Sequence, residues 1–158
     1  MELMDITDKN DKVIGQEYRN KIHRTGQWHR GIHILVFSNG RLILQKRKRK
    51  FDLSVSEHLK EGEDYEEGAL RGLSEELGAS DVKLKKLGKF RMNYGENDNM
   101  ISVLFQCDYN GKIKSKDEIV FLTNDEIKLM LKDKEKFAKW TLEYLKYFFE
   151  MKSELEKI

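Results

Sequence analysis

The segment GIHILVFSNGRLILQKRK, residues 31–48, constrains the fold most, because it has the pattern of two strands joined by a tight turn. Residues 31–38 and 41–48 both contain runs of β-branched and large apolar side chains. Between them stands Asn39-Gly40, a dipeptide that favours a two-residue hairpin turn, because both residues tolerate positive φ. A chain that contains this segment is expected to fold around a sheet.

The rest of the chain mixes further strand patterns with helix patterns. Residues 64–77 place Ala69, Leu70, Leu73 and Leu77 on one helical face, with Gly78 positioned to end the helix. A second helix is expected at 123–133, where Thr123 or Asn124 precedes Glu126 in a capping pattern, and a third, long and aromatic, at 136–157. The segment 19–30 is ambiguous between a helical turn and a loop. The remaining strand-like runs are residues 3–8, 12–18, 51–59, 82–93, 101–109 and 118–122.

Strands and helices do not alternate strictly, which favours an α+β sandwich with helices packed on a mixed sheet. The length of 158 residues predicts a single domain spanning 1–158, with an N-terminal β-hairpin and a long C-terminal helix. One cysteine, Cys107, excludes an internal disulfide and fits a cytoplasmic protein, in which we expect it to be a buried apolar residue. The first residues lack the apolar stretch of a signal peptide, so we expect none, and the sequence has no apolar run of the ~20 residues that a membrane span needs.

Residues 57–79 carry the chemistry. Glu75 and Glu76 are adjacent on the predicted helix, Arg71 can pair with Glu75 one turn away, and Glu63 lies in the preceding loop. Clustered carboxylates without cysteine suit a hard cation, Mg²⁺ or Mn²⁺. Taken alone, such charge spacing is also common on solvated helix faces.

The order and spacing of these residues resemble the sequence motif of the Nudix hydrolase family, called the Nudix box. The box runs Gly, five residues, Glu, seven residues, then Arg-Glu-apolar-any-Glu-Glu-any-Gly-apolar. The matching positions are Glu63, Arg71, Leu73, Glu75, Glu76, Gly78 and Ala79. The resemblance implies a Nudix α/β/α sandwich with a mixed central sheet. It also implies a metal site at Glu75, Glu76 and Glu63, with Arg71 and Glu63 ordering the loop and the substrate.

Two positions depart from the box. Glu57 stands where its first glycine is expected, and Gly72 stands where its first helical glutamate is expected. A glycine inside a helix costs about 1 kcal/mol relative to alanine, so it indicates either close approach of another group or loss of the chemistry. Carboxylates that could replace the missing one and activate water are Glu57, Glu96, Asp98, Asp117 and Glu118, of which Glu118 is our first choice.

The wider sequence resembles the Nudix branch that contains isopentenyl diphosphate isomerases and related hydrolases. Ser56 stands where the isomerases have a cysteine, and Met100 falls near their catalytic glutamate, so isomerase chemistry is not expected. His23 and His29 match the isomerases' metal-binding histidines only after a one-residue gap. We therefore expect His23, His29, His33 and His58 to be ordinary strand or loop residues and not a metal cluster.

The basic run at 46–50 offers cations for a phosphate, and Arg47 is the favoured one. The run lacks interleaved aromatic residues and the net charge is only +2, so a nucleic-acid partner is not expected. Trp28 is the candidate for stacking on a base, whereas Trp140, Tyr144, Tyr147, Phe148 and Phe149 are expected in the core or in a homodimer contact.

The sequence therefore predicts a Mg²⁺-dependent (or Mn²⁺-dependent) hydrolase that cleaves a diphosphate linkage in a small, nucleotide-like substrate. Glu76, Glu75 and Glu118 are the predicted catalytic residues. One alternative is a catalytically inactive Nudix domain that binds a nucleotide or a protein, and the other is an isomerase-like enzyme.

Overall fold

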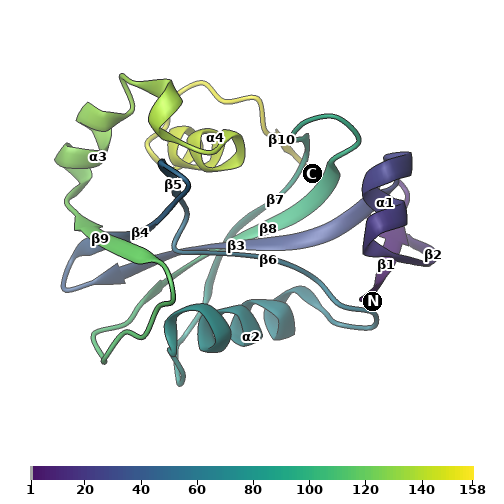
Figure 1. Ribbon diagram of the computed structural model, residues 1–158, viewed down its shortest axis with the longest axis horizontal. Helices are drawn as coiled ribbons and strands as arrows, with labels where there is room; N and C mark the ends of the chain where they lie inside the picture. Colours follow the sequence, from purple (N-terminus) through teal and green to yellow (C-terminus); the bar gives the residue numbers. More distant parts are fainter. Residues whose placement is uncertain (1) are drawn as a thin grey trace.

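A mixed β-sheet forms the centre of the computed structural model, which describes residues 2–158 (Figure 1). The strands are β1 (Leu3–Thr7), β2 (Val13–Tyr18), β3 (Trp28–Ser38), β4 (Arg41–Arg47), β5 (Lys50–Asp52), β6 (Val55–His58), β7 (Lys85–Asn93), β8 (Asn99–Asp108), β9 (Glu118–Leu122) and β10 (Glu156–Lys157). The helices are α1 (Arg19–Thr25), α2 (Tyr65–Leu77), α3 (Asn124–Met130), the 3₁₀ turn η1 (Lys134–Lys136) and α4 (Lys139–Phe148).

Strand β3 is the hub of this sheet. It runs parallel to β8 from the pair His29↔Met100 to the pair Phe37↔Asp108, and antiparallel to β1, β4 and β6. The predicted turn between β3 and β4 is present, with φ of 50° at Asn39 and 78° at Gly40. The predicted mixed sheet is confirmed, because one parallel pairing is embedded among antiparallel ones.

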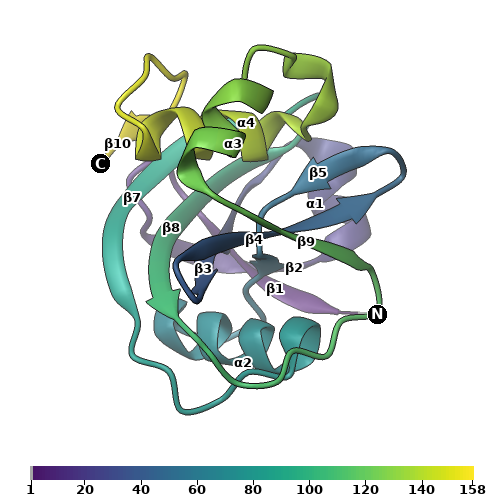
Figure 2. The ribbon, with the colours of Figure 1, turned by 90° about the vertical axis from the view of Figure 1, so that its left-hand side faces the viewer.

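The two faces of the sheet carry separate hydrophobic cores. Successive side chains of a strand point to opposite faces, so Ile32 and Ile34 face α2, whereas Leu35 and Phe37 face the opposite layer with α3 and α4. Figures 1 and 2 show α2 on one side of the sheet and α3 with α4 on the other. The α/β/α sandwich is thereby confirmed.

The helix caps agree with the sequence patterns. Asp64 and Thr123 each accept a hydrogen bond from the backbone N–H three residues later, and Glu67 and Glu126 close the two capping boxes. Gly78 ends α2 in the left-handed conformation, with φ of 65°. The ambiguous segment 19–30 forms α1 and the first residues of β3.

The predicted long C-terminal helix is wrong in its extent. Helix α4 ends at Phe148, and Glu150, with φ of 58°, turns the chain back. Residues Glu156–Lys157 then form β10 against the edge of β7, where the Arg91 guanidinium donates to the Glu156 carboxylate at 2.6 Å. The edge of β7 has free backbone groups that can pair with an extended segment. The periodicity of the C-terminal sequence could not predict this pairing, because it depends on a distant strand. Within residues 2–158, no helix is both long and apolar enough to cross a membrane.

Candidate active site

The candidate site lies where β6, the loop after it and α2 meet. Strand β6 pairs with β3 through Ile32↔Glu57 and three neighbouring pairs, which fixes the direction of its side chains. The capping box at Asp64 fixes the start of α2. These two rigid elements carry Glu57, Glu75 and Glu76 and can hold them in fixed positions, whereas Glu63 lies in the loop between them.

Arg71 and Glu63 form an internal brace. The Arg71 Nε and Nη2 atoms donate to the Glu63 carboxylate at 2.8 and 2.9 Å, and Nη2 also donates to the backbone oxygen of His58 at 2.9 Å. Arg71 Nη1 reaches Glu75 at 3.2 Å. The hydrogen bond and charge of Glu63 raise the pKa of Arg71, and those of Arg71 lower the pKa of Glu63. Both residues thus tie the loop to α2, and their charged atoms are already engaged within the protein.

Glu76 is the buried carboxylate of the site. Its Oε1 accepts hydrogen bonds from Gln45 Nε2 at 2.8 Å and Arg47 Nη2 at 3.1 Å, whereas Oε2 is buried and has no donor among the described residues. Burial, together with the neighbouring Glu57 carboxyl, raises the pKa of Glu76 to about 8. A buried carboxylate oxygen without a donor is costly, and it fits a group that awaits a cation.

Gly72 lies on α2 one turn before Glu76, and side chains of β6 cover this part of the helix. A Cβ on Gly72 would meet Val55 Cγ1 at 2.9 Å and Glu57 Cγ at 3.1 Å. Of the two explanations that the sequence left open for this glycine, close approach of another group is therefore present, and it is made by the protein's own strand β6. A glutamate placed at position 72 of the parent chain would collide with these two side chains.

A cavity of about 210 Å³ opens beside these groups. Its lining is made by Gln45, Arg47, Glu57, Glu75, Glu76, Lys116 and Asp117. Glu118 is exposed on β9, where it pairs with Lys46, and it is absent from this lining. Of the carboxylates considered as substitutes for the missing one, Glu57 and Asp117 reach the cavity.

Arg47, which the sequence analysis favoured as a phosphate-binding cation, lies among three carboxylates, of which one is Glu76. Its Nε donates to Asp117 Oδ2 at 2.9 Å, its Nη1 lies 3.6 Å from Asp52 Oδ2, and its side chain is 39% exposed. Burial is outweighed by the surrounding carboxylates Glu76, Asp52 and Asp117, which raise the pKa of Arg47. The guanidinium is permanently charged and lines both this cavity and a second one.

The second cavity measures about 340 Å³ and is partly aromatic. Trp140 lines it and is held by a hydrogen bond from Nε1 to Asp52 Oδ1 at 2.8 Å. Tyr94 lines it as well, and its hydroxyl lies 2.7 Å from the hydroxyl of the buried Tyr144. The sequence pattern did not separate Trp140 from its core neighbours, and Trp28 instead lines an open depression with Lys9 and Arg91.

His33 also lines the second cavity and is almost fully buried. Its Nδ1 lies 2.9 Å from Ser56 Oγ and its Nε2 lies 3.3 Å from the Tyr94 hydroxyl. Complete burial lowers the pKa of His33 to about 3, because no charged partner compensates the loss of hydration. His33 is therefore a neutral, hydrogen-bonded wall residue, as expected from the sequence.

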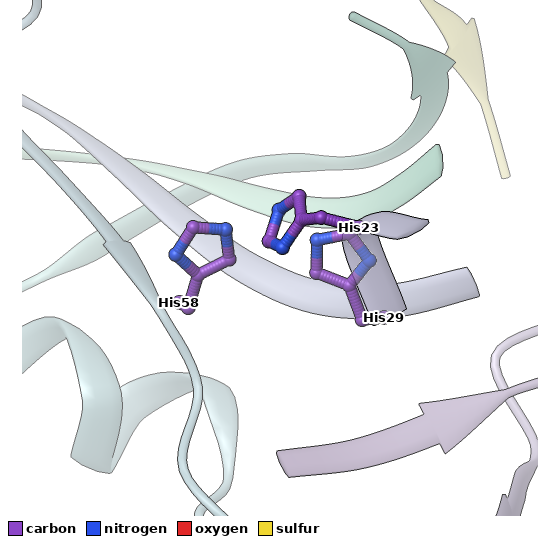
Figure 3. A group of neighbouring side chains, drawn as sticks. All are labelled: His23, His29 and His58. Carbon is purple, nitrogen blue, oxygen red and sulfur yellow. The ribbon is translucent and has the colours of Figure 1, made fainter. Parts of the chain in front are cut away.

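We expected the other three histidines to be ordinary strand or loop residues and not a metal cluster, but the structure brings them together. His23 from α1, His29 from β3 and His58 from β6 bring one ring nitrogen each to within 4.8 Å of one another (Figure 3). Asp98 completes the group, with its Oδ1 atom 3.7 Å from His23 Nε2 and 3.6 Å from His29 Nε2. The three histidines are distant in sequence, so no local spacing of residues could predict that they lie together.

The ring tautomers of this cluster suit a metal ion. The Nδ1 atoms of His23 and His29 lie 2.9 and 3.1 Å from the backbone oxygens of Arg19 and Gln27, so Nδ1 carries the proton and Nε2 keeps its lone pair. His29 Nε2 and Asp98 Oδ1 are buried without a hydrogen-bond partner among residues 2–158. Burial lowers the pKa of His29 and of His58, which keeps both rings neutral. Three imidazoles and one carboxylate are the donors that Zn²⁺ and other divalent transition metals prefer.

Comparison with known proteins decides the family. The family model described as the NUDIX domain matches residues 27–145. The chain belongs to the Nudix family. Among its relatives, an uncharacterized Nudix hydrolase of Clostridium acetobutylicum is 34% identical over 146 residues, covering 80% of this chain and 70% of the relative. Isopentenyl-diphosphate Delta-isomerase 2 of Photorhabdus laumondii is 34% identical over 134 residues, covering 80% of this chain and 73% of the relative.

Solved structures agree on the fold. DR0079 from Deinococcus radiodurans superposes with a TM-score of 0.78 at 20% identity, covering 92% of this chain and 98% of that one. The Nudix domain of Shewanella oneidensis NrtR, solved with ADP ribose, gives a TM-score of 0.59 at 13% identity, covering 78% of this chain and 87% of that one. Both the predicted branch of the family and the predicted fold are thereby confirmed.

Proposed function

We propose that this Nudix protein hydrolyses the diphosphate linkage of a nucleoside diphosphate derivative, using Mg²⁺ or Mn²⁺ held by the box carboxylates. The observation that carries the proposal is Glu76 Oε2, a buried carboxylate oxygen without a donor that adjoins a carboxylate-lined cavity and the Arg47 guanidinium. Glu76 and Glu75 line that cavity and would hold the cation. When bound, the cation would neutralise charge on the diphosphate and activate water.

Other residues around the cavity would bind the phosphate and position the carboxylates. Arg47, steered by Asp117 and Asp52, orients a phosphate at the junction of the two cavities. The brace between Arg71 and Glu63 keeps β6 and α2 at a fixed separation, which positions the carboxylates. Glu63 therefore serves the metal site by positioning, because both its oxygens already accept hydrogen bonds from Arg71.

A carboxylate must also accept the proton of the attacking water. Asp117 and Glu57 line the cavity, so they are better placed for this role than Glu118, our first choice from the sequence. The second cavity, with Trp140 at its wall, offers an aromatic surface to the moiety beyond the diphosphate. The ADP-ribose complex of the Shewanella domain supports a nucleotide in that role.

Phosphate-release assays over nucleoside diphosphate derivatives with Mg²⁺ and Mn²⁺ test the proposal, with Glu76→Gln as the control. We expect turnover that Glu76→Gln lowers at least 100-fold, in line with the loss of other metal and general-base carboxylates. Tight nucleotide binding without turnover by the parent would instead favour the inactive binding module.

A second candidate function, isomerisation of isopentenyl diphosphate, is favoured by the histidine cluster. His23, His29, His58 and Asp98 would hold a divalent transition metal there. Two residues argue against the isomerase: Ser56 donates to or accepts from His33 where a cysteine would be expected, and Met100 is buried and cannot move a proton. We therefore expect no conversion to dimethylallyl diphosphate. Product detection by the parent, absent from a Glu76→Gln control, would overturn this choice.

A further inference from the structure

Glu57 and Gly72 are the two positions at which the box departs from its family pattern, and the fold brings them into contact. Glu57 Cγ lies 3.1 Å and Glu57 Cβ 3.7 Å from the place that a Cβ of residue 72 would take. Glu57 belongs to β6 and Gly72 to the facing side of α2. The Glu57 side chain, together with Val55 Cγ1 at 2.9 Å, therefore occupies the space that a helical side chain at position 72 would need.

The carboxyl group of Glu57 also reaches the functional position. Glu57 and Glu76 both line the 210 Å³ cavity, and the Glu57 carboxyl is near enough to help raise the pKa of Glu76. The Glu76 side chain is nine-tenths buried, and its Oε2 has no donor in the described part of the chain. Two neighbouring carboxylates, one buried and short of donors, repel each other unless one of them is protonated, and a divalent cation between them would relieve the repulsion with both groups ionised.

Pairing with Arg71 does not account for Glu57. The distance from Glu57 Oε2 to Arg71 Nη1 is 3.6 Å, longer than the contacts of Arg71 with Glu63 at 2.8 Å and Glu75 at 3.2 Å. The charge of Arg71 is thus already balanced by two nearer carboxylates. Glu57 has no other ionic partner among the ion pairs of residues 2–158.

We propose that Glu57 holds the divalent cation together with Glu76, in the role that the box assigns to a carboxylate at position 72. The two departures are then one exchange: the carboxylate has moved from α2 to β6, and the small residue has moved from β6 to α2. The number of carboxylates facing the cavity is unchanged by such an exchange. This inference rests on the proposed function for the location of the cation.

The first experiment measures Mg²⁺ binding through thermal stability, without any turnover. Imidazole ligands hold Mg²⁺ poorly, so the titration reports the carboxylate site and not the histidine cluster. Glu57→Gln should weaken Mg²⁺ binding at least tenfold and shrink the Mg²⁺-induced rise in Tm. Glu61→Gln is the matched control, because Glu61 is exposed in the following loop and its side chain has no partner among residues 2–158. An unchanged Mg²⁺-induced shift in Glu57→Gln, even with a lower metal-free Tm, would show a purely structural role and overturn the proposal.

The second experiment reverses the exchange. Glu57→Gly should lose Mg²⁺ affinity, and Gly72→Glu alone should lose stability, because its Cβ meets Val55 and Glu57. The double variant Glu57→Gly with Gly72→Glu is made in a Val55→Ala background, because Val55 Cγ1 would still lie 2.9 Å from the new Cβ. In that background it should regain affinity relative to Glu57→Gly. A folded double variant that binds Mg²⁺ no better than Glu57→Gly would refute the exchange. If the double variant does not fold, the Glu57→Gln titration decides the proposal by itself.

The two proposals fail separately. Mg²⁺ binding that depends on Glu57 in a protein without turnover would keep the cation site and reject the hydrolase. Turnover with Mg²⁺ binding that ignores Glu57 would keep the hydrolase and reject the exchange.

Discussion

Protonation of His33 is expected to set part of the acid limit of this protein's stability. The pKa of His33 falls from 6.5 to about 3 on folding, so between these values the unfolded chain binds a proton that the folded chain does not. Stability is therefore complete above pH 6.5 and decreases as the pH falls toward 3. Each pH unit in this window costs about 1.4 kcal/mol, which gives roughly 2.7 kcal/mol at pH 4.5.

The magnitude rests on the surroundings of the ring. His33 is 4% exposed, and its ring contacts the neutral groups Ser56, Tyr94 and Tyr144. None of them can balance a positive charge, so the buried imidazolium keeps nearly its whole desolvation cost. His29 and His58 add further acid sensitivity, but they do so equally in any variant that leaves them in place.

Urea denaturation of the parent and His33→Asn between pH 7.5 and 4.5 measures the effect. The variant loses packing and hydrogen bonds at every pH, so its free energy of unfolding should be lower throughout. The test is therefore how the difference in unfolding free energy between the parent and the variant changes with pH. We expect the parent's advantage to shrink by about 2.7 kcal/mol across this range. Ser56→Ala is the control, because it removes a hydrogen-bond partner and leaves the titrating ring. Parallel curves for the parent and His33→Asn would refute the reasoning.

Three further predictions concern the site. Because the pKa of Glu76 is raised to about 8, Mg²⁺ binding at pH 7 should release a proton, seen by calorimetry as a dependence of the binding enthalpy on buffer, and Glu76→Gln should abolish that dependence. His23→Gln removes one ligand of the histidine cluster, so Zn²⁺ binding should weaken at least tenfold while Mg²⁺ binding stays unchanged. An equal loss of Zn²⁺ and Mg²⁺ binding would indicate that both ions bind at a single site. Arg47→Lys keeps the charge but loses the fork that spans Asp117 and Glu76, so kcat/KM should fall about tenfold or more, and parent-like kinetics would remove Arg47 from phosphate binding.

Local signals in the sequence predicted local structure well. The Asn39-Gly40 turn, the capping boxes at Asp64 and Thr123, and the glycine stop at Gly78 all depend on residues a few positions apart. The interactions that stabilise these turns and caps lie within a few residues of one another, so they can be predicted without knowledge of tertiary contacts. The end of α4 was missed because strand β10 is stabilised by the distant edge of β7 and not by its own sequence.

The candidate site divides in the same way. The helix pattern predicted the pair of Arg71 with Glu75, whereas the ordering of the loop by Arg71 and Glu63 followed only from the resemblance to the Nudix box. Neither revealed that the charges of Arg71 and Glu63 are engaged internally. The histidine cluster joins α1, β3 and β6, and its assembly depends on the register of β6 against β3. A one-residue shift of that register would move His58 to the other face of the sheet.

Strand β6 is thus the element that connects both candidate metal sites. Val55 and Glu57 point toward α2, where they cover Gly72, whereas Ser56 and His58 point to the opposite face, toward His33 and His29. Alternation along a single short strand delivers a carboxylate to one cluster and an imidazole to the other. The backbone oxygen of His58 accepts from Arg71, so the box arginine also fixes the strand that carries the third histidine. Loss of the Arg71 brace should therefore disturb both sites together, whereas loss of Glu57 or of His23 should disturb only one.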